Sequence, residues 1–291
     1  MNLGVWDGWV VTAKAVTYAA TFGSAGGVFF LAYSHALLAA PDRLKIQRLI
    51  RILMIVAVLA CGARIALTAA SMSGDAAGLV DSGLMRMIWQ AGEGRATSTR
   101  VIGLLLAACA MHLNRRPGAL ALAAAGAAAT SFAWVGHVHA LAAAWALLLI
   151  GVHLLSGAFW LGALGPLLLI ARHEDPRRAA GPAARFGKAA LVVVGALVIA
   201  GLALAWVLMG NLSQWPGSNY GRLLAVKLGL VASLLGVGAF NKLRLTPRLL
   251  AGDVRAVRSL VSSIRAEMAL AACILWVTAC LTTLTGPPAL E

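Results

Sequence analysis

The chain has 291 residues, of which 61% are hydrophobic and 12% are charged, and its mean hydropathy is +0.87. Soluble domains are about 45–50% apolar and about 25% charged. The formal net charge is +14, but the basic residues form short clusters between long apolar runs instead of one continuous patch. These features exclude a soluble globular domain, a nucleic-acid-binding protein and a disulfide scaffold. They indicate a polytopic membrane protein.

Long apolar runs divide the chain into spans. A hydrocarbon core of ~30 Å requires about 20 residues of helix, and continuous apolar runs favour helices over the alternating segments of a β-barrel. We therefore predict an all-α bundle of about eight transmembrane helices in a single transmembrane domain, residues 1–291. In chain order the predicted spans are 10–38, 49–73, 98–113, 118–138, 141–171, 187–209, 221–241 and 266–285.

Alternate connecting segments differ in charge. The segments 41–51, 113–117, 171–188 and 242–265 hold most of the 24 basic residues. The positive-inside rule places such segments in the cytoplasm, so both termini are expected outside, on the periplasmic face. The first residues have no positively charged region and no small-residue cleavage site, so no removable signal peptide is expected.

Histidines in the apolar runs are the main candidates for a functional site. His137 and His139 form an H-x-H pair at the outer end of the fourth predicted span, and His153 lies near the middle of the fifth. Trp160 follows seven residues after His153, on the same helix face. Imidazole binds copper, zinc, iron and nickel, and a titratable group in hydrocarbon usually marks a site or pathway. A wet helix cap and a hydrogen-bonded core histidine remain open alternatives.

Other polar or sulfur-containing residues are weaker candidates. Met85 and Met87 form an M-x-M in the outer segment, and thioether is a soft ligand for copper(I), although methionine also fills apolar gaps. The four cysteines all lie in predicted spans and are interpreted as packing residues. Arg64 and Lys227 lie inside the second and seventh spans, where few acids are available to pair with them. No nucleotide-binding or hydrolase motif is present, so no enzyme activity is expected.

Three segments resemble the CopD family of copper-resistance proteins of the bacterial inner membrane. They are VHLLSGAFWLGALGPLLL at 152–169, the run 218–250 and the run 259–288, and the W-x-G-H at 134–137 also fits. The resemblance covers 133–288, while residues 1–130, with four predicted spans, match only in helix count and loop pattern. The family pattern includes, at positions of this chain, His137, His153, Trp160, Tyr220, Lys227, Asn241, Pro247, Arg265 and Glu267.

The resemblance implies copper transport across the inner membrane, from periplasm to cytoplasm, together with a separate periplasmic copper carrier of the CopC type. We expect a copper ion, Cu(I) or Cu(II), as the ligand. The expected ligands are His137, His139, His153, Met85 and Met87, and the expected supporting residues are Trp160, Arg64, Lys227 and Asn241. Two other functions remain open: a haem-binding membrane redox protein, with histidines on adjacent helices, and a copper-delivery assembly factor that does not transport. Membrane lipid is an expected partner and nucleic acid is not, and the sequence predicts no oligomeric state.

Overall fold

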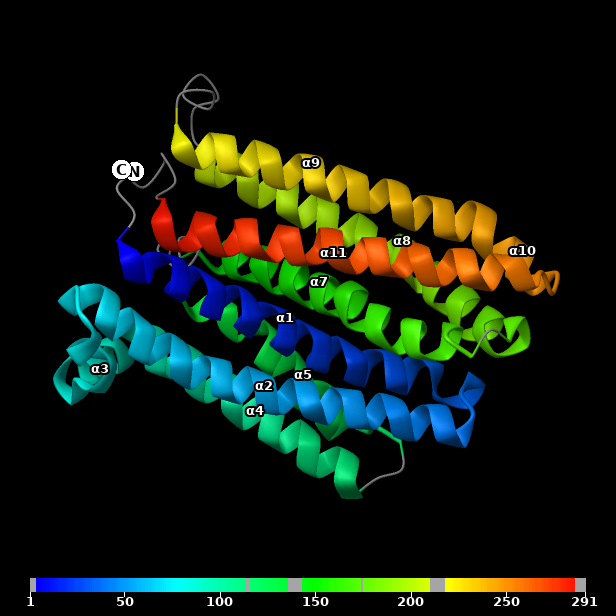
Figure 1. Cartoon of the computed structure of the whole chain (residues 1–291), viewed down its shortest axis with the longest axis horizontal. Helices are drawn as coiled ribbons and strands as arrows, with labels where there is room; N and C mark the ends of the chain where they lie inside the picture. The colour runs from blue at the N-terminus through cyan, green and yellow to red at the C-terminus, as the bar shows by residue number, and fades with distance from the viewer. Residues whose placement is uncertain (1–3, 114–115, 136–142, 174, 210–217, 286–291) are drawn as a thin grey trace.

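The computed structural model describes residues 4–113, 116–135, 143–173, 175–209 and 218–285, and these ranges are helical with no strand. In chain order (Figure 1) the helices are α1 (Val5–Ser34), α2 (Ala40–Ser73), α3 (Ser82–Ile88), α4 (Gly94–Leu113), α5 (Ala119–Thr130), α7 (Ala144–Ala171), α8 (Pro176–Met209), α9 (Asn219–Phe240), α10 (Thr246–Leu250) and α11 (Val254–Leu284). Short 3₁₀ turns follow α1, α2 and α5. Two π-helical turns, Trp89–Glu93 and Asn241–Leu245, precede α4 and α10.

Seven helical stretches in the described part of the chain are long and apolar enough to cross a membrane. They correspond to seven of the eight predicted spans, which confirms an all-helical multi-pass membrane protein. The third stretch, Ser82–Leu113, is longer than expected, and it consists of α3 and α4 joined across a kink at Ala91 and Gly92. The fourth predicted span, 118–138, corresponds to a shorter apolar stretch, Ala119–Trp134, made of α5 and the 3₁₀ turn after it.

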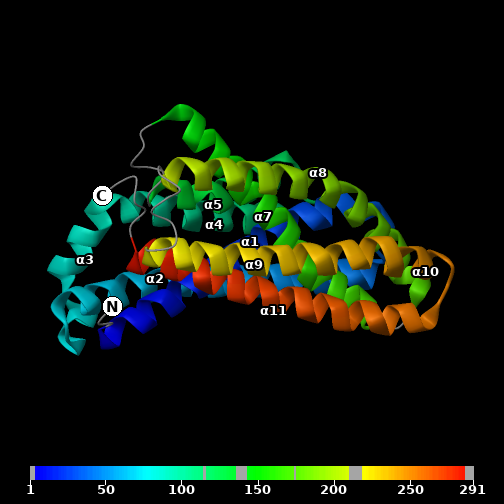
Figure 2. The same cartoon turned by 90° about the horizontal axis from the view of Figure 1, so that it is seen from above.

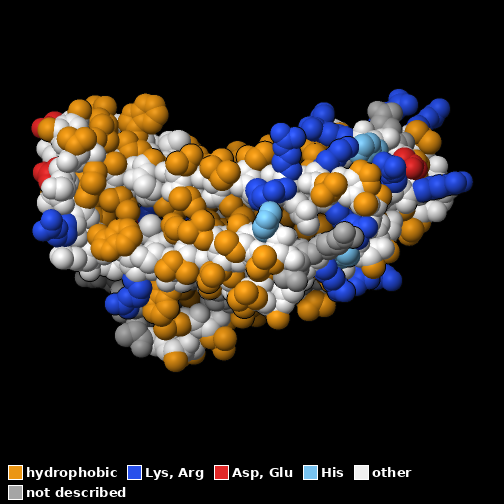
Figure 3. Space-filling model, turned by 90° about the horizontal axis from the view of Figure 1, so that it is seen from below, with side chains coloured by type: hydrophobic (Ala, Val, Ile, Leu, Met, Phe, Trp, Pro, Cys, Tyr) orange, Lys and Arg blue, Asp and Glu red, His pale blue; other side chains and the backbone are white. Residues whose placement is uncertain are grey.

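The helices run up and down in one bundle, with a basic end and an opposite end. On the face drawn in Figure 3, lysine and arginine gather at the end where α10 lies, and apolar side chains cover the middle. We call this the basic end. Helix α3 lies at the opposite end in both ribbon views (Figures 1 and 2). Because α1 begins and α11 finishes at that opposite end, we call it the termini end.

Helix α1 packs against α2, α5, α7 and α11, more partners than a peripheral span could have. Its crossing with α7 has no room for a side chain at two facing glycines. A Cβ at Gly26 would collide with the Ala158 carbonyl and lie 2.8 Å from the Cα of Gly162, and a Cβ at Gly162 would lie 2.7 Å from the amide nitrogen of Gly27. Small residues allow this approach, which stabilises helix pairs in lipid through van der Waals contact.

We therefore expect Gly26→Ala to lower the free energy of unfolding by about 1–3 kcal/mol, because the added methyl must push the α1 and α7 backbones apart. Gly62→Ala on α2 is the matched control, since nothing lies within 4 Å of a Cβ there. That control is expected to be neutral or to stabilise by up to about 1 kcal/mol, the helix-propensity difference. Denaturant titration in mixed detergent micelles measures the free energy of unfolding of both variants. Equal changes in the two variants would contradict the close packing of α1 on α7.

Candidate functional site

His153 lies inside α7 and is held in one orientation by α8. Its Nδ1–H donates to the backbone carbonyl of Leu197 at 3.1 Å. Gly201, one turn further along α8, makes the approach possible, since a Cβ there would lie 3.0 Å from Cε1 of the imidazole. A carbonyl that accepts from Nδ1–H leaves the lone pair on Nε2. Within the described ranges nothing hydrogen-bonds that second nitrogen, so Nε2 is available as a metal ligand.

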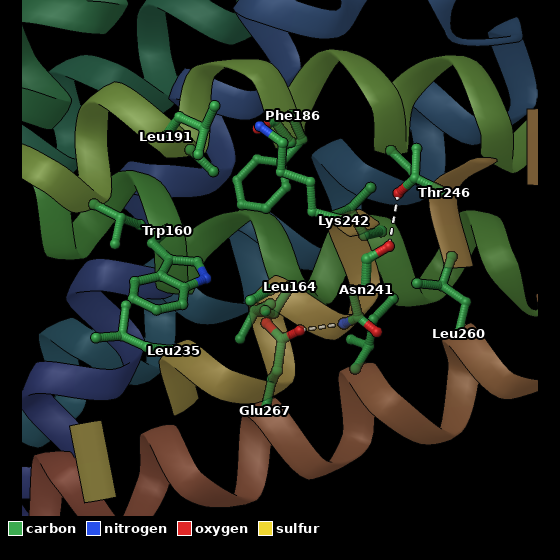
Figure 4. Close-up of a pocket in the computed structure, with 18 residues that line it drawn as sticks. Trp160, Leu164, Phe186, Leu191, Leu235, Asn241, Lys242, Thr246, Leu260 and Glu267 are labelled. Atoms are coloured by element: carbon green, nitrogen blue, oxygen red, sulfur yellow. Dashed lines mark hydrogen bonds between the residues drawn. The ribbon is translucent and has the colours of Figure 1, made fainter. Parts of the chain in front are cut away.

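A cavity of about 320 Å³ lies between α7, α8, α9 and α11, displaced from His153 toward the basic end. Most of its lining is apolar, with Phe186 and Leu191 from α8 and Leu235 from α9. Trp160, two turns along α7 from His153, forms part of the wall (Figure 4). On α7 the lining of the cavity therefore starts at Trp160, two turns from His153.

A buried carboxylate supplies the polar chemistry of this cavity. Glu267 of α11 is 3% exposed and accepts a hydrogen bond from the Nδ2 amide of Asn241. The indole nitrogen of Trp160 lies on the same side of the cavity and points toward this carboxylate (Figure 4), as a second donor near it. In the described part of the chain no lysine, arginine or histidine forms an ion pair with Glu267. The site thus presents an acidic group that neutral donors hold in place.

The π-helical turn Asn241–Leu245 at the end of α9 positions two of the lining residues. Such turns contain an extra residue and are frequent at functional sites. Thr246 donates to the backbone carbonyl of Asn241 at 3.0 Å, while the side-chain Oδ1 of Asn241 is buried and unpartnered among the described residues. Lys242 reaches across to α8 and donates to the Gly187 carbonyl at 2.9 Å. The cavity therefore has an unused acceptor beside Glu267 and an ammonium on its wall.

The structure brings together some of the residues that the sequence nominated. Trp160 and Asn241 both line the cavity, whereas His153 lies two turns along α7 from Trp160 and is not part of the lining. Lys227 of α9 is close enough to His153 for its charge to act on the imidazole. His137 and His139 lie outside the described residues. Nowhere in the described ranges do three or more histidine, cysteine, aspartate or glutamate residues form a group that could hold a metal ion.

The two methionines and Arg64 lie elsewhere in the bundle. Met85 and Met87 are both on α3, and residues two apart on a helix do not face each other. Met87 is 47% exposed. Arg64 of α2 forms an ion pair with Glu93, at the turn before α4, so its partner comes from a segment that reads as a loop. These positions do not line the cavity.

Two groups at the cavity were absent from the predicted ligands and supporting residues. Glu267 was named only as part of the family pattern, and Lys242 only by its charge in a basic segment. The signal for Glu267 was present, because it is an acidic residue within an apolar run that ends at Leu284. No sequence signal places Lys242 at the cavity, since its position depends on the π-helical turn.

Comparisons with known proteins give a consistent result. The family model described as "Copper resistance protein D-like, N-terminal domain" matches residues 5–146, and the model "Copper resistance protein D" matches residues 180–281. The chain is 28% identical over 141 residues to the "Copper transport protein CutJ" of Bacillus subtilis (strain 168). That match covers 47% of this chain and 25% of the relative, so the chain spans a quarter of that protein's length. No solved structure matches.

The contact between His153 and Gly201 can be tested by a double-mutant cycle. We expect Gly201→Ala to destabilise the protein by about 1–3 kcal/mol, because the methyl displaces the imidazole from its hydrogen bond. In a His153→Ala background the same change should be neutral or stabilise by up to about 1 kcal/mol, since the obstacle is gone and alanine favours the helix. The free energy of unfolding in micelles measures the coupling. An identical effect in both backgrounds would show that the two residues do not touch.

Proposed function

Because the chain belongs to the copper resistance protein D family, we propose that it carries copper ions across the bacterial inner membrane, from the periplasm to the cytoplasm. One observation carries the proposal: His153 is fixed through Nδ1, with Nε2 free among the described groups, and a cavity that contains a buried carboxylate lies further along α7 toward the basic end. Imidazole is a good ligand for copper. A carboxylate in a low-dielectric region lowers the electrostatic cost of a passing cation.

The proposed orientation of the chain in the membrane is supported by the charge distribution and by the number of crossings. Lys14 near the start of α1 donates to the Thr282 carbonyl near the end of α11, at 2.9 Å, so the two helix ends lie together. A chain that returns to the same side crosses an even number of times, which favours α5 as an eighth crossing beside the seven long ones. The positive-inside rule then favours a cytoplasmic basic end and a periplasmic termini end.

The proposed route starts at the periplasmic face. A separate copper carrier of the CopC type would deliver the ion to His137 and His139, with Met85 and Met87 as further ligands near that face. The ion then passes to Nε2 of His153 and on to the cavity with Glu267. Lys227 near His153 repels a bound cation, which keeps the binding weak enough for release. Conduction requires sites that bind well enough to load and weakly enough to unload.

Copper binding and uptake by the purified chain test this proposal. We expect wild type to bind copper and to admit Cu(I) into liposomes that contain a fluorescent copper chelator. His153→Ala should reduce both binding and uptake by about 10- to 100-fold, the usual cost of disturbing a metal site. Glu267→Gln keeps a side chain of the same shape but removes the charge, so uptake should fall about tenfold while binding at His153 persists.

The control is Met268→Leu, which changes a half-exposed thioether next to Glu267 in sequence but outside the cavity lining. It should match wild type in binding and in uptake. Binding that depends on His153 without any uptake would contradict transport and favour a copper-delivery assembly factor. An absorption band typical of haem in the purified protein would contradict the copper route and favour a redox protein.

A further inference from the structure

A second polar cluster lies in the N-terminal helices, away from the cavity. It contains Lys14 of α1, Arg64 of α2, Glu93 and, on α4, the fully buried Arg100. Arg64 pairs with Glu93, while Lys14 donates to backbone and hydroxyl oxygens of α11. The charges of Arg64, Glu93 and Arg100 all act on Lys14, so the four groups share one region of the bundle.

Neutral groups hold the guanidinium of Arg100. Its Nε donates to the Ser131 hydroxyl at 3.0 Å, and its Nη1 donates to the Cys61 sulfur at 3.6 Å. The guanidinium carbon lies 3.8 Å from the centroid of the Phe132 ring. None of the described acids forms an ion pair with Arg100.

The cluster carries an uncompensated positive charge. Three cations face one carboxylate, and Glu93 is already paired with Arg64. Arginine does not lose its proton in proteins, so one full charge remains on Arg100 even if Lys14 is neutral. An unpaired charge in a region of low dielectric costs several kcal/mol. The expected solution is a counter-ion.

Unused hydrogen-bond donors gather in the same region. Six buried side-chain polar atoms have no partner among the described residues, and three of them belong here: Nε of Arg64, Nη2 of Arg100 and the hydroxyl of Thr97. Thr97 lies one turn from Arg100 on α4, so its hydroxyl is on the helix face that carries the guanidinium. All three residues are at most 6% exposed. All three atoms can donate.

We propose that this cluster binds a small monovalent anion, with chloride as the type case, between α1, α2 and α4. Donors that lie beside a net positive charge match an acceptor-only ligand. The charge that remains on Arg100 requires one negative charge beside it. Burial of the three donors, together with Phe132 against Arg100, favours an ion of halide size over a phosphate ester. The site is separate from the copper route and does not depend on it.

Equilibrium binding of radioactive chloride to the purified chain, in detergent and without copper, tests the proposal. We expect one saturable chloride site per chain. Bromide should displace the bound chloride, and gluconate should not, because it is too large for the site. Thr97→Val should weaken binding about tenfold, through loss of one donor to an anion. The hydroxyl has no described partner, so this variant is expected to fold normally. Thermal unfolding of the variant in gluconate buffer, without chloride, checks its folding independently of anion binding.

Two further variants make the test specific. Thr99→Val is the matched control, because its hydroxyl donates to the Arg95 carbonyl of its own helix at 2.9 Å, and it should bind chloride like wild type. Glu93→Gln should tighten chloride binding, because it frees Arg64 and raises the positive charge by one. Absence of chloride binding, or equal chloride affinity of the Thr97 and Thr99 variants, would overturn the proposal. It would also be overturned if the purified chain retained one phospholipid per chain that bromide does not displace, because a lipid phosphate would then occupy the site.

Discussion

A very close backbone contact joins α1 to α7, and the rest of the arrangement depends on it. Gly26 and Gly162 meet where any side chain would force the two helices apart. Apolar burial gives no net attraction between helices in lipid, so packing of this kind is what holds them. Helix α7 carries His153 and Trp160, and α1 carries Lys14. One glycine-lined crossing therefore sets both polar regions of the molecule relative to each other.

Low dielectric then determines how each polar region is built. Near Glu267, neutral donors from Asn241 and Trp160 satisfy a single acid, and the apolar walls leave an open cavity. Around Arg100 the balance is reversed, with buried cations and donors in excess of acceptors. A buried group without partners is costly in either case. The cavity thus offers a carboxylate with the Lys242 ammonium on its wall, whereas the N-terminal cluster offers cations and unused donors.

The composition and the length of the apolar runs predict the membrane bundle well, because a run of about 20 apolar residues is long enough to span the bilayer as a helix. Spacing also places His153 and Trp160 on one face of α7 correctly. Pairings between distant segments were harder to predict. Glu93 reads as a loop residue, yet it lies directly after the kink between α3 and α4, where its carboxylate pairs with Arg64. In the sequence Lys14 and Arg100 are recognisable only as basic residues. The sequence does not show which of the polar atoms around them lack a hydrogen-bond partner in the fold.

A cationic cluster raises the energy of a cation that passes nearby, and the size of this effect depends on the distance and on the local dielectric constant. Two unit charges about 20 Å apart repel by about 0.8 kcal/mol at an effective dielectric constant of about 20, and more in drier surroundings. After Arg64 has paired with Glu93, the cluster holds two cations that no described acid pairs, Lys14 and Arg100. An anion held by Arg64, Arg100 and Thr97 would cancel one of these charges while the guanidiniums stay in place. On this view the anion lowers the repulsion that the N-terminal helices exert on a cation on the proposed route along α7.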